Sequence, residues 1–211
     1  MASTLLQLVD RAANELSVSA PTTVIGNTTQ DVVNLLALTN AVGYELSREH
    51  DWQTIDKEYR TTTVFYTYTG TVTSGSTSVT SMSSIVGLST RFMVTGTGIN
   101  QDTYVTAAVG TTITLSQAAS ASGTAVSLTF SQTLYPMPSD YDRLVDNTDW
   151  DKSRHWEMLG PETAQQWQWL KSGYISTGPR MRFRVLGGFF QIWPPSAIAD
   201  YTGITYINKQ W

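Results

Sequence analysis

The sequence predicts an α+β protein in which an α-helical bundle with a small β-hairpin or sheet carries an inserted all-β domain. Apolar residues recur with a helical period near the N-terminus, short β-like runs rich in Ser, Thr and Gly fill the middle, and a hairpin signal follows near the C-terminus. We therefore expect a discontinuous helical domain over residues 1–69 and 131–211. The inserted domain, an Ig-like sandwich or a barrel, is expected over residues 70–130.

The composition is typical of a folded protein with a sizeable core and argues against several classes of function. The chain has 211 residues, of which 41% are hydrophobic and 14% charged, and its net charge is −4. An acidic chain lacks the basic face with which proteins grip a nucleic-acid backbone. Without cysteine there is no disulfide, thiolate metal site or Cys nucleophile. We see no secretory signal or membrane-length apolar run, so we expect a soluble protein made in the cytoplasm.

The first predicted helix covers Ser3–Val18. Its apolar side chains fall at positions i, i+3, i+4, i+7 and i+11, which places them in one stripe. Ser3 or Thr4 is the expected N-cap, and the helix ends before Pro21.

The second predicted helix, Thr28–His50, has a similar apolar stripe. Thr28 and Asp31 have the spacing of a capping box, with Asp in place of the usual Glu. Gly43 lies inside this helix, where glycine costs about 1 kcal/mol relative to alanine but allows a neighbouring helix to approach. Two consecutive helices joined by a short loop usually pack antiparallel.

Residues 70–131 form a different kind of sequence, with Arg91 and Asp102 as their only charged residues. Glycine-containing breaks separate short β-like runs, which is typical of a small sandwich or barrel. The runs are Ser78–Thr80, Phe92–Thr95, Tyr104–Ala107, Thr111–Leu115 and Ala125–Phe130. Because Val64–Tyr68 and Phe130–Tyr135 look like two strands of one hairpin, we interpret the stretch between them as an insertion at a loop tip.

The stretch Tyr135–Trp150 combines prolines, acids and aromatics. It predicts an extended segment at its start, then a turn capped by an acidic side chain, and then a segment held in place by buried apolar side chains. Its acids could cap and solvate the turn, bind a hard cation, or include the carboxylate pair of a glycosidase. The spacing lacks the Gly and the distal Glu of an EF-hand loop, and nothing singles out a pair, which favours the first interpretation. The acids are Asp140, Asp142, Asp146, Asp149 and Asp151.

Nothing else in the sequence indicates an enzyme. Neither G-x-S-x-G nor H-E-x-x-H occurs, and the two histidines, His50 and His155, are more typical of packed or solvated residues than of a general base. We therefore expect no catalytic residue, no cofactor and no metal.

A third helix is predicted over Trp156–Gly173, with its start at Gly160-Pro161-Glu162 and with Gly173 just past its end. It carries Trp167 and Trp169, which cannot both face the same side of a helix because they are two residues apart. One of them, together with Trp211, is a candidate contact with a partner, since tryptophan is enriched at the centres of interfaces.

Three strands are predicted after that helix. Arg180–Val185 and Phe189–Trp193 flank Gly187-Gly188, which is a hairpin turn signal, and Tyr201–Ile207 follows.

Outside the inserted stretch, the amino-acid sequence resembles that of the head-to-tail adaptor (connector) proteins of tailed bacteriophages. The segments that carry the resemblance are TLLQLVDRAANELSV, LLALTNAVGYELSREHDW, YPMPSDYDRLVDNTDWD, LGPETAQQWQWLK, FFQIWPPS and ITYINKQW. The inserted stretch resembles the β modules of phage virion proteins, often described as Ig-like or carbohydrate-binding, in SGSTSVTSMSSIVGL, MVTGTGI and TTITLSQAASASGT.

The resemblance implies a virion structural protein in the neck between head and tail. It implies a homo-oligomeric ring, typically of twelve copies, that lies beneath the portal protein, extends the DNA channel and holds a tail nozzle or tube protein. Viral DNA would pass through without specific binding, which suits an acidic chain, and no membrane is involved. The residues implied to contact the portal or a neighbouring subunit are Tyr206, Ile207, Lys209, Gln210, Trp211, Trp167 and Trp169.

The alternative is a glycan-binding or decoration protein associated with the tail or neck. In that case the inserted domain would bind a sugar, and Tyr68 and Tyr104 would be its stacking residues.

Overall fold

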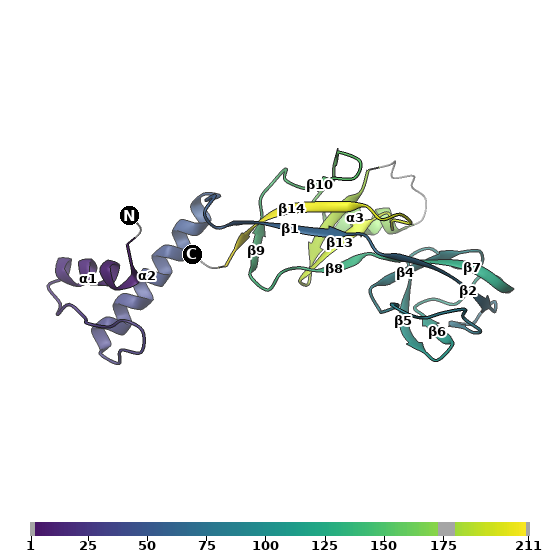
Figure 1. Cartoon of the computed structure of the whole chain (residues 1–211), viewed down its shortest axis with the longest axis horizontal. Coiled ribbons are helices and arrows are strands. Elements are labelled where there is room, and N and C mark those ends of the chain that lie inside the picture. The colour runs from purple at the N-terminus through teal and green to yellow at the C-terminus, as the bar shows by residue number, and fades with distance from the viewer. Residues whose placement is uncertain (1–2, 173–179, 210–211) are drawn as a thin grey trace. The chain divides into compact units, whose positions relative to one another are not determined.

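The computed structural model describes residues 3–172 and 180–209. The chain divides into two compact units (Figure 1). Unit 1 comprises Met1–Asp56 with Ile207–Trp211, and unit 2 comprises Lys57–Tyr206. Unit 1 holds helices α1 (Leu5–Glu15) and α2 (Gln30–Glu49), whereas unit 2 is built mainly from β-strands.

The predicted α+β class, with a helical bundle as its main domain, is wrong. The described part of the chain has three helices of 11, 20 and 8 residues, whereas its fourteen strands form three sheets. Helices α1 and α2 form a single hairpin, and α3 (Ala164–Lys171) lies in the other unit, so no bundle exists. The described protein is mostly β: in addition to the predicted strands, β9 and β10 of the central stretch pair with β14, and β11 pairs with β10.

The N-terminal helices form where their sequence pattern predicts them. Thr4 is the N-cap of α1, and its hydroxyl and the Gln7 side chain satisfy each other's backbone N–H groups in a capping box. The capping box predicted at Thr28 is wrong: the N-cap of α2 is Thr29, whose N–H donates to Asn27 Oδ1 at 2.9 Å. The hairpin core is small and consists of Val9, Ala13, Val24, Val32 and Leu35.

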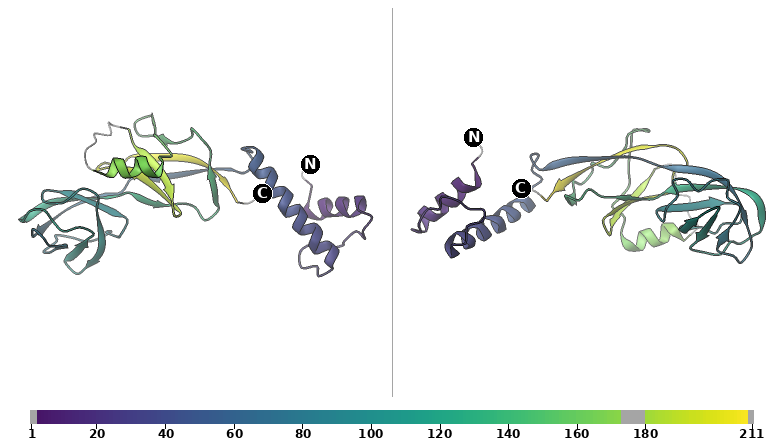
Figure 2. Two further views of the ribbon diagram at one scale, coloured as in Figure 1. Left: turned by 180° about the vertical axis from the view of Figure 1, so that it is seen from behind. Right: turned by 60° about the horizontal axis from the view of Figure 1, so that its bottom comes forward.

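The predicted inserted stretch, together with residues 65–69 and 131–132 on either side of it, forms a six-stranded sheet that almost closes into a barrel (Figure 2). Its strands, in sheet order, are β2 (Phe65–Val72), β7 (Gly123–Gln132), β4 (Phe92–Gly96), β5 (Thr103–Val109), β6 (Thr112–Leu115) and β3 (Ser78–Val79). A bridge between Thr71 and Thr80 joins the first strand to the last, with backbone hydrogen bonds of 2.8 and 3.0 Å. All five predicted β runs are confirmed as strands. The pairing of Phe65 with Ser131 confirms that the two flanking strands are neighbours.

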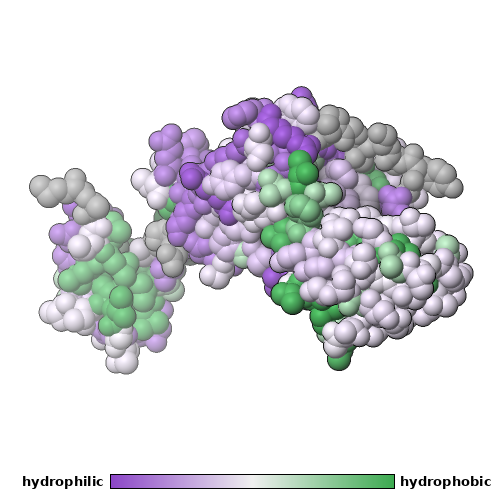
Figure 3. All heavy atoms as spheres, turned by 45° about the vertical axis from the view of Figure 1, so that its right-hand side comes forward, coloured by the Kyte–Doolittle hydropathy of each residue, from purple (hydrophilic) through white to green (hydrophobic). Residues whose placement is uncertain are grey.

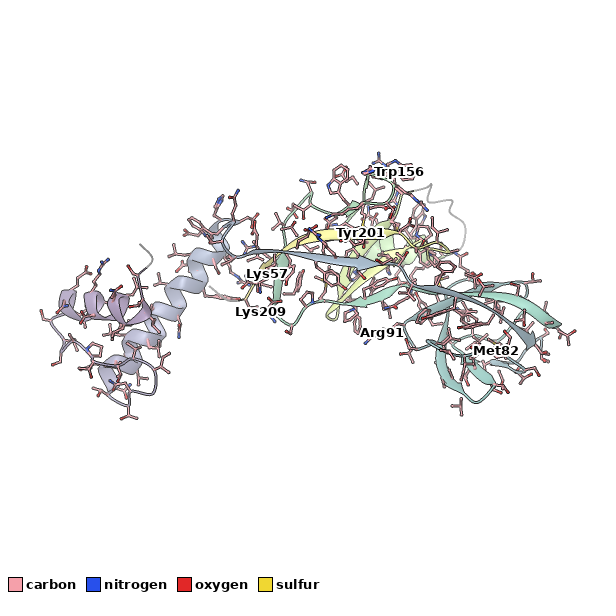
Figure 4. The ribbon with its side chains drawn as sticks, in the orientation of Figure 1. Lys57, Met82, Arg91, Trp156, Tyr201 and Lys209 are labelled. Carbon is pink, nitrogen blue, oxygen red and sulfur yellow. The ribbon has the colours of Figure 1, made fainter. Side chains whose placement is uncertain are left out.

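The seam of this barrel requires a glycine. A Cβ at Gly70 would lie 2.6 Å from Met82 Sδ and 2.8 Å from Val79 Cγ1, closer than packed atoms approach. Met82 itself is buried in the barrel core (Figure 4). Gly70 therefore lets β2 approach the residues that close the barrel.

The remaining strands of unit 2 form two sheets. One has the order β1 (Asp56–Thr62), β14 (Tyr201–Asn208), β10 (Trp150–Asp151) and β11 (Trp156–Glu157), with β9 (Tyr141–Leu144) also on β14. The other has the order β12 (Arg182–Leu186), β13 (Phe189–Trp193) and β8 (Leu134–Pro136). The predicted hairpin is confirmed, with Gly187 and Gly188 at φ values of 61° and 78° in its turn. Both sheets contribute to one core, made of Tyr135, Met158, Met181, Phe183, Phe190, Ile192 and Ile204.

Helix α3 packs against both the barrel and the three-stranded sheet. Trp167 and Leu170 of the helix pack with Met93 of β4 and Trp193 of β13 in one buried cluster. The helix begins at Ala164, after a capping box between Thr163 and Gln166, so it starts shortly after the predicted Gly160-Pro161-Glu162. The predicted end at Gly173 lies outside the described residues.

Candidate interaction surface

An apolar groove runs along α2 in unit 1 (Figure 3). At about 1.5 Å per residue, α2 is about 30 Å long and α1 about 17 Å, so α1 cannot cover all of α2. Leu38, Val42 and Leu46 consequently remain 59%, 53% and 48% exposed. This part of the groove is lined by Leu8, Ala12, Leu16, Leu35, Leu38, Thr39, Val42, Gly43 and Leu46.

The groove continues past the end of α2. A second hollow shares Gly43 and Leu46 with the first, and its other lining residues are Ser47, Trp52, Thr54 and Ile55. Trp52 is fixed there because its indole N–H donates to the carbonyl oxygen of Leu46 at 2.8 Å, which satisfies an acceptor in the last turn. We call the two hollows together the α2 groove.

The predicted contacts at the C-terminus do not form one exposed surface. Tyr206 is buried in β14, where its hydroxyl donates to Asp140 Oδ1 at 2.9 Å, and Ile207 is buried as well. Burial, with the Asp140 carboxylate beside it, raises the pKa of Tyr206 to about 12. Lys209 is exposed after the strand ends (Figure 4). Gln210 and Trp211 lie outside the described residues.

The two tryptophans of α3 face different environments. Trp167 is 5% exposed and belongs to the cluster that joins α3 to the barrel, whereas Trp169 is 57% exposed. Trp169 is thus the one of the pair that a partner could reach in this structure.

The acids of the central stretch have separate surroundings. Asp140 pairs with Lys57 at 2.5 Å and accepts from Tyr206, while Asp151 Oδ1 accepts from the backbone N–H groups of Ser153 and Arg154. Within residues 3–172 and 180–209, no group of three or more His, Asp or Glu side chains is arranged to hold a metal ion.

Asp149 is a buried acid that the sequence analysis did not distinguish from its neighbours. Its side chain is almost fully buried, and Oδ1 has no hydrogen-bond partner among the described residues. Burial, and to a lesser degree the charges of Asp146 and Glu157, raise the pKa of Asp149 to about 7. No sequence signal marks it, because its burial depends on the pairing of β10 with β11 and β14.

The two tyrosines named for sugar stacking are half-buried strand residues. The Tyr68 ring stacks on Tyr66 at 5.8 Å, and its hydroxyl donates to the carbonyl oxygen of Val86. Tyr104 borders the α3 cluster, and Lys171 Nζ lies 5.3 Å from its ring centroid. Burial raises the pKa of Tyr104 to about 12. In this structure their rings contact protein groups rather than forming a shared exposed platform.

Comparison of the chain with protein-family models, curated proteins and solved structures found no match. A search of the described helices for a segment long and apolar enough to cross a membrane also found none.

Proposed function

We propose that this protein is a structural adaptor that works as an oligomer. The observation that carries the proposal is the α2 groove, an apolar surface in a helical hairpin whose own core has only five buried residues. Contiguous exposed apolar surface marks interaction sites, because its burial contributes about 25 cal/mol per Å². A second protein surface in the groove would give the hairpin the apolar contacts that it cannot make within one chain.

We place this adaptor in the virion neck of a tailed bacteriophage, and the support for that place is the sequence resemblance. A homo-oligomeric ring, typically of twelve copies, would lie between the portal protein and a tail nozzle or tube protein after the chain is made in the host cytoplasm. The net charge of −4 suits a channel through which viral DNA passes without specific binding.

We propose a shorter segment for the portal contact than the resemblance implies. Tyr206 and Ile207 fill the core, so the contact is proposed for Lys209, Gln210 and Trp211 alone. Removing these three residues leaves the buried side chains of β14 in place.

The experiment is sedimentation of the purified protein, alone and mixed with the portal protein of the same genome. We expect a ring-sized species, or co-sedimentation near one-to-one with portal subunits. A chain shortened after Asn208 should still self-associate but bind the portal less well. A full-length protein that remains monomeric and ignores the portal would remove the proposal.

A further inference from the structure

Helix α2 carries apolar side chains on two opposite faces. Successive residues are rotated by about 100°, so Val33, Ala37 and Tyr44 follow one another along one line. This line lies about 160–180° from Leu35, which is at the centre of the groove stripe. Val33 is 43% and Tyr44 46% exposed, and Ala37 is exposed as well. We call Val33, Ala37, Tyr44 and Arg48 the back face of α2.

The two faces differ in charge. Arg48 belongs to the back face, and its guanidinium carbon lies 4.6 Å from the centroid of the Tyr44 ring. By the same helical rotation, Glu45 follows Val42 and Glu49 follows Leu46 by three residues, so both acids flank the groove stripe. Glu15 of α1 lies two turns beyond Leu8 on the same side of that helix, where Arg11 is its neighbour at i−4, and all three acids are exposed. Glu45 and Glu49 therefore form an acidic edge at the end of the groove near the C-terminus of α2, whereas the back face has a cation.

We infer that the back face of one copy docks into the α2 groove of a second copy, in a head-to-tail arrangement. This inference rests on the proposed function and specifies its subunit contact. Tyr44 would supply the apolar anchor, Arg48 would meet the acidic edge, and Gly43 would allow close approach because it has no side chain on the floor of the groove. Since the two surfaces lie on opposite faces of one helix, each copy can use both at once, as a ring requires.

The test uses the same substitution on each face. Val42→Glu places a charge in the groove and Val33→Glu places one on the back face, at positions that are 53% and 43% exposed within one chain. Each variant keeps one competent surface. We therefore expect each alone to sediment as a monomer, and an equimolar mixture to form a one-to-one dimer that grows no further. Val86→Glu, at a 75% exposed position of the barrel, is the matched control and should assemble like the wild type.

The outcomes separate this inference from the proposed function. If the wild type assembles but the mixture stays monomeric, or if Val33→Glu assembles like the wild type, the head-to-tail contact is wrong and the adaptor proposal stands. A wild type that stays monomeric at millimolar concentration and does not bind the portal would overturn both. Far-UV circular dichroism verifies folding, and a variant that loses helix is replaced by Val42→Ser or Val33→Ser at the same positions.

Discussion

The barrel of unit 2 buries most of its large apolar side chains, whereas the helical hairpin of unit 1 leaves many of them exposed. The barrel packs eleven buried residues into one core, and its large exposed apolar side chains are Val86 and Val109, both next to turns. The hairpin buries five residues and exposes many large apolar side chains, namely Leu6, Leu8, Leu16, Ile25, Val33, Leu38, Val42, Tyr44 and Leu46.

This difference in burial arises because the sheet of the barrel closes on itself and the helical hairpin does not. In the barrel, the Thr71–Thr80 bridge gives both end strands a partner, so the apolar face of the sheet encloses its own core. Two helices of unequal length cannot enclose each other, and the longer one keeps an apolar surface beyond the reach of the shorter. The barrel thus buries its core within one chain, whereas the hairpin leaves an apolar surface to which a second protein surface is proposed to bind.

The largest expected effect contrasts a core residue of the barrel with an exposed groove residue of the hairpin. Phe130→Ala removes a fully buried ring from the barrel and should lower the free energy of unfolding by about 3–5 kcal/mol. Val42→Ala in the exposed groove should change it by less than about 0.5 kcal/mol in the monomer. Chemical denaturation of both variants at low protein concentration measures the difference. Equal losses would show that Val42 is buried in the monomer and that the groove is not an exposed surface.

The next effect concerns the contact between α3 and the barrel. Trp167→Ala removes the indole that packs on Met93 and Trp193, and should cost about 3 kcal/mol. Trp169→Ala, two residues away on the same helix but 57% exposed, is the control and should cost less than about 0.5 kcal/mol. Chemical denaturation compares the two variants. A larger loss for the Trp169 variant would contradict the assigned faces of the helix.

A pH-dependent effect is expected from Asp149. Because its folded-state pKa is raised to about 7 from the ordinary value of 3.8, the folded chain keeps a proton that the unfolded chain loses between these pH values. Its contribution to stability therefore falls as pH rises from about 4 to 7 and is constant above that range. Asp149→Asn should remove this dependence and add roughly 4 kcal/mol at pH 8 relative to pH 4.

Urea denaturation of the wild type and of Asp149→Asn at several pH values measures that difference. Asp142→Asn provides a control, since Asp142 is an acid of the same stretch that is only half-buried. A pH dependence that is the same in all three proteins would rule out Asp149 as its source.

The smallest effect separates stability from assembly. Gly43→Ala should raise the stability of the monomer by about 0.5–1 kcal/mol, because alanine is the better helix former. The added methyl group would occupy the floor of the α2 groove, so self-association should weaken at the same time. Thermal unfolding and sedimentation of the same sample measure both quantities. Stronger assembly together with higher stability would show that the groove floor is not part of the contact.

Local patterns predicted much of the secondary structure but not the fold class. The strands of the barrel and the β12–β13 hairpin appear as expected, because glycine turns and β-branched runs act over a few residues. Trp156–Glu157, at the edge of the stretch predicted to carry a helix, forms β11 by pairing with Trp150–Asp151. Pairing with another segment overrides local preference, and the sequence of one segment does not reveal its partner.

The interaction surface was predicted only in part. The amphipathic pattern of α2 indicated an apolar stripe, but the stripe was expected to be buried in a bundle that does not exist. Tyr206 and Ile207 were expected to face a partner, yet both are buried, because β14 has other strands beside it and core on both faces.

By itself, the sequence determined features that depend on near neighbours: the capping box at Thr4, the glycine turn at Gly187-Gly188 and the strands of the barrel. The tertiary structure alone decided which tryptophan of α3 is buried, why the Asp149 pKa is raised and which part of α2 stays uncovered. The reason is physical, since burial depends on residues that are far apart along the chain and meet only when the protein folds.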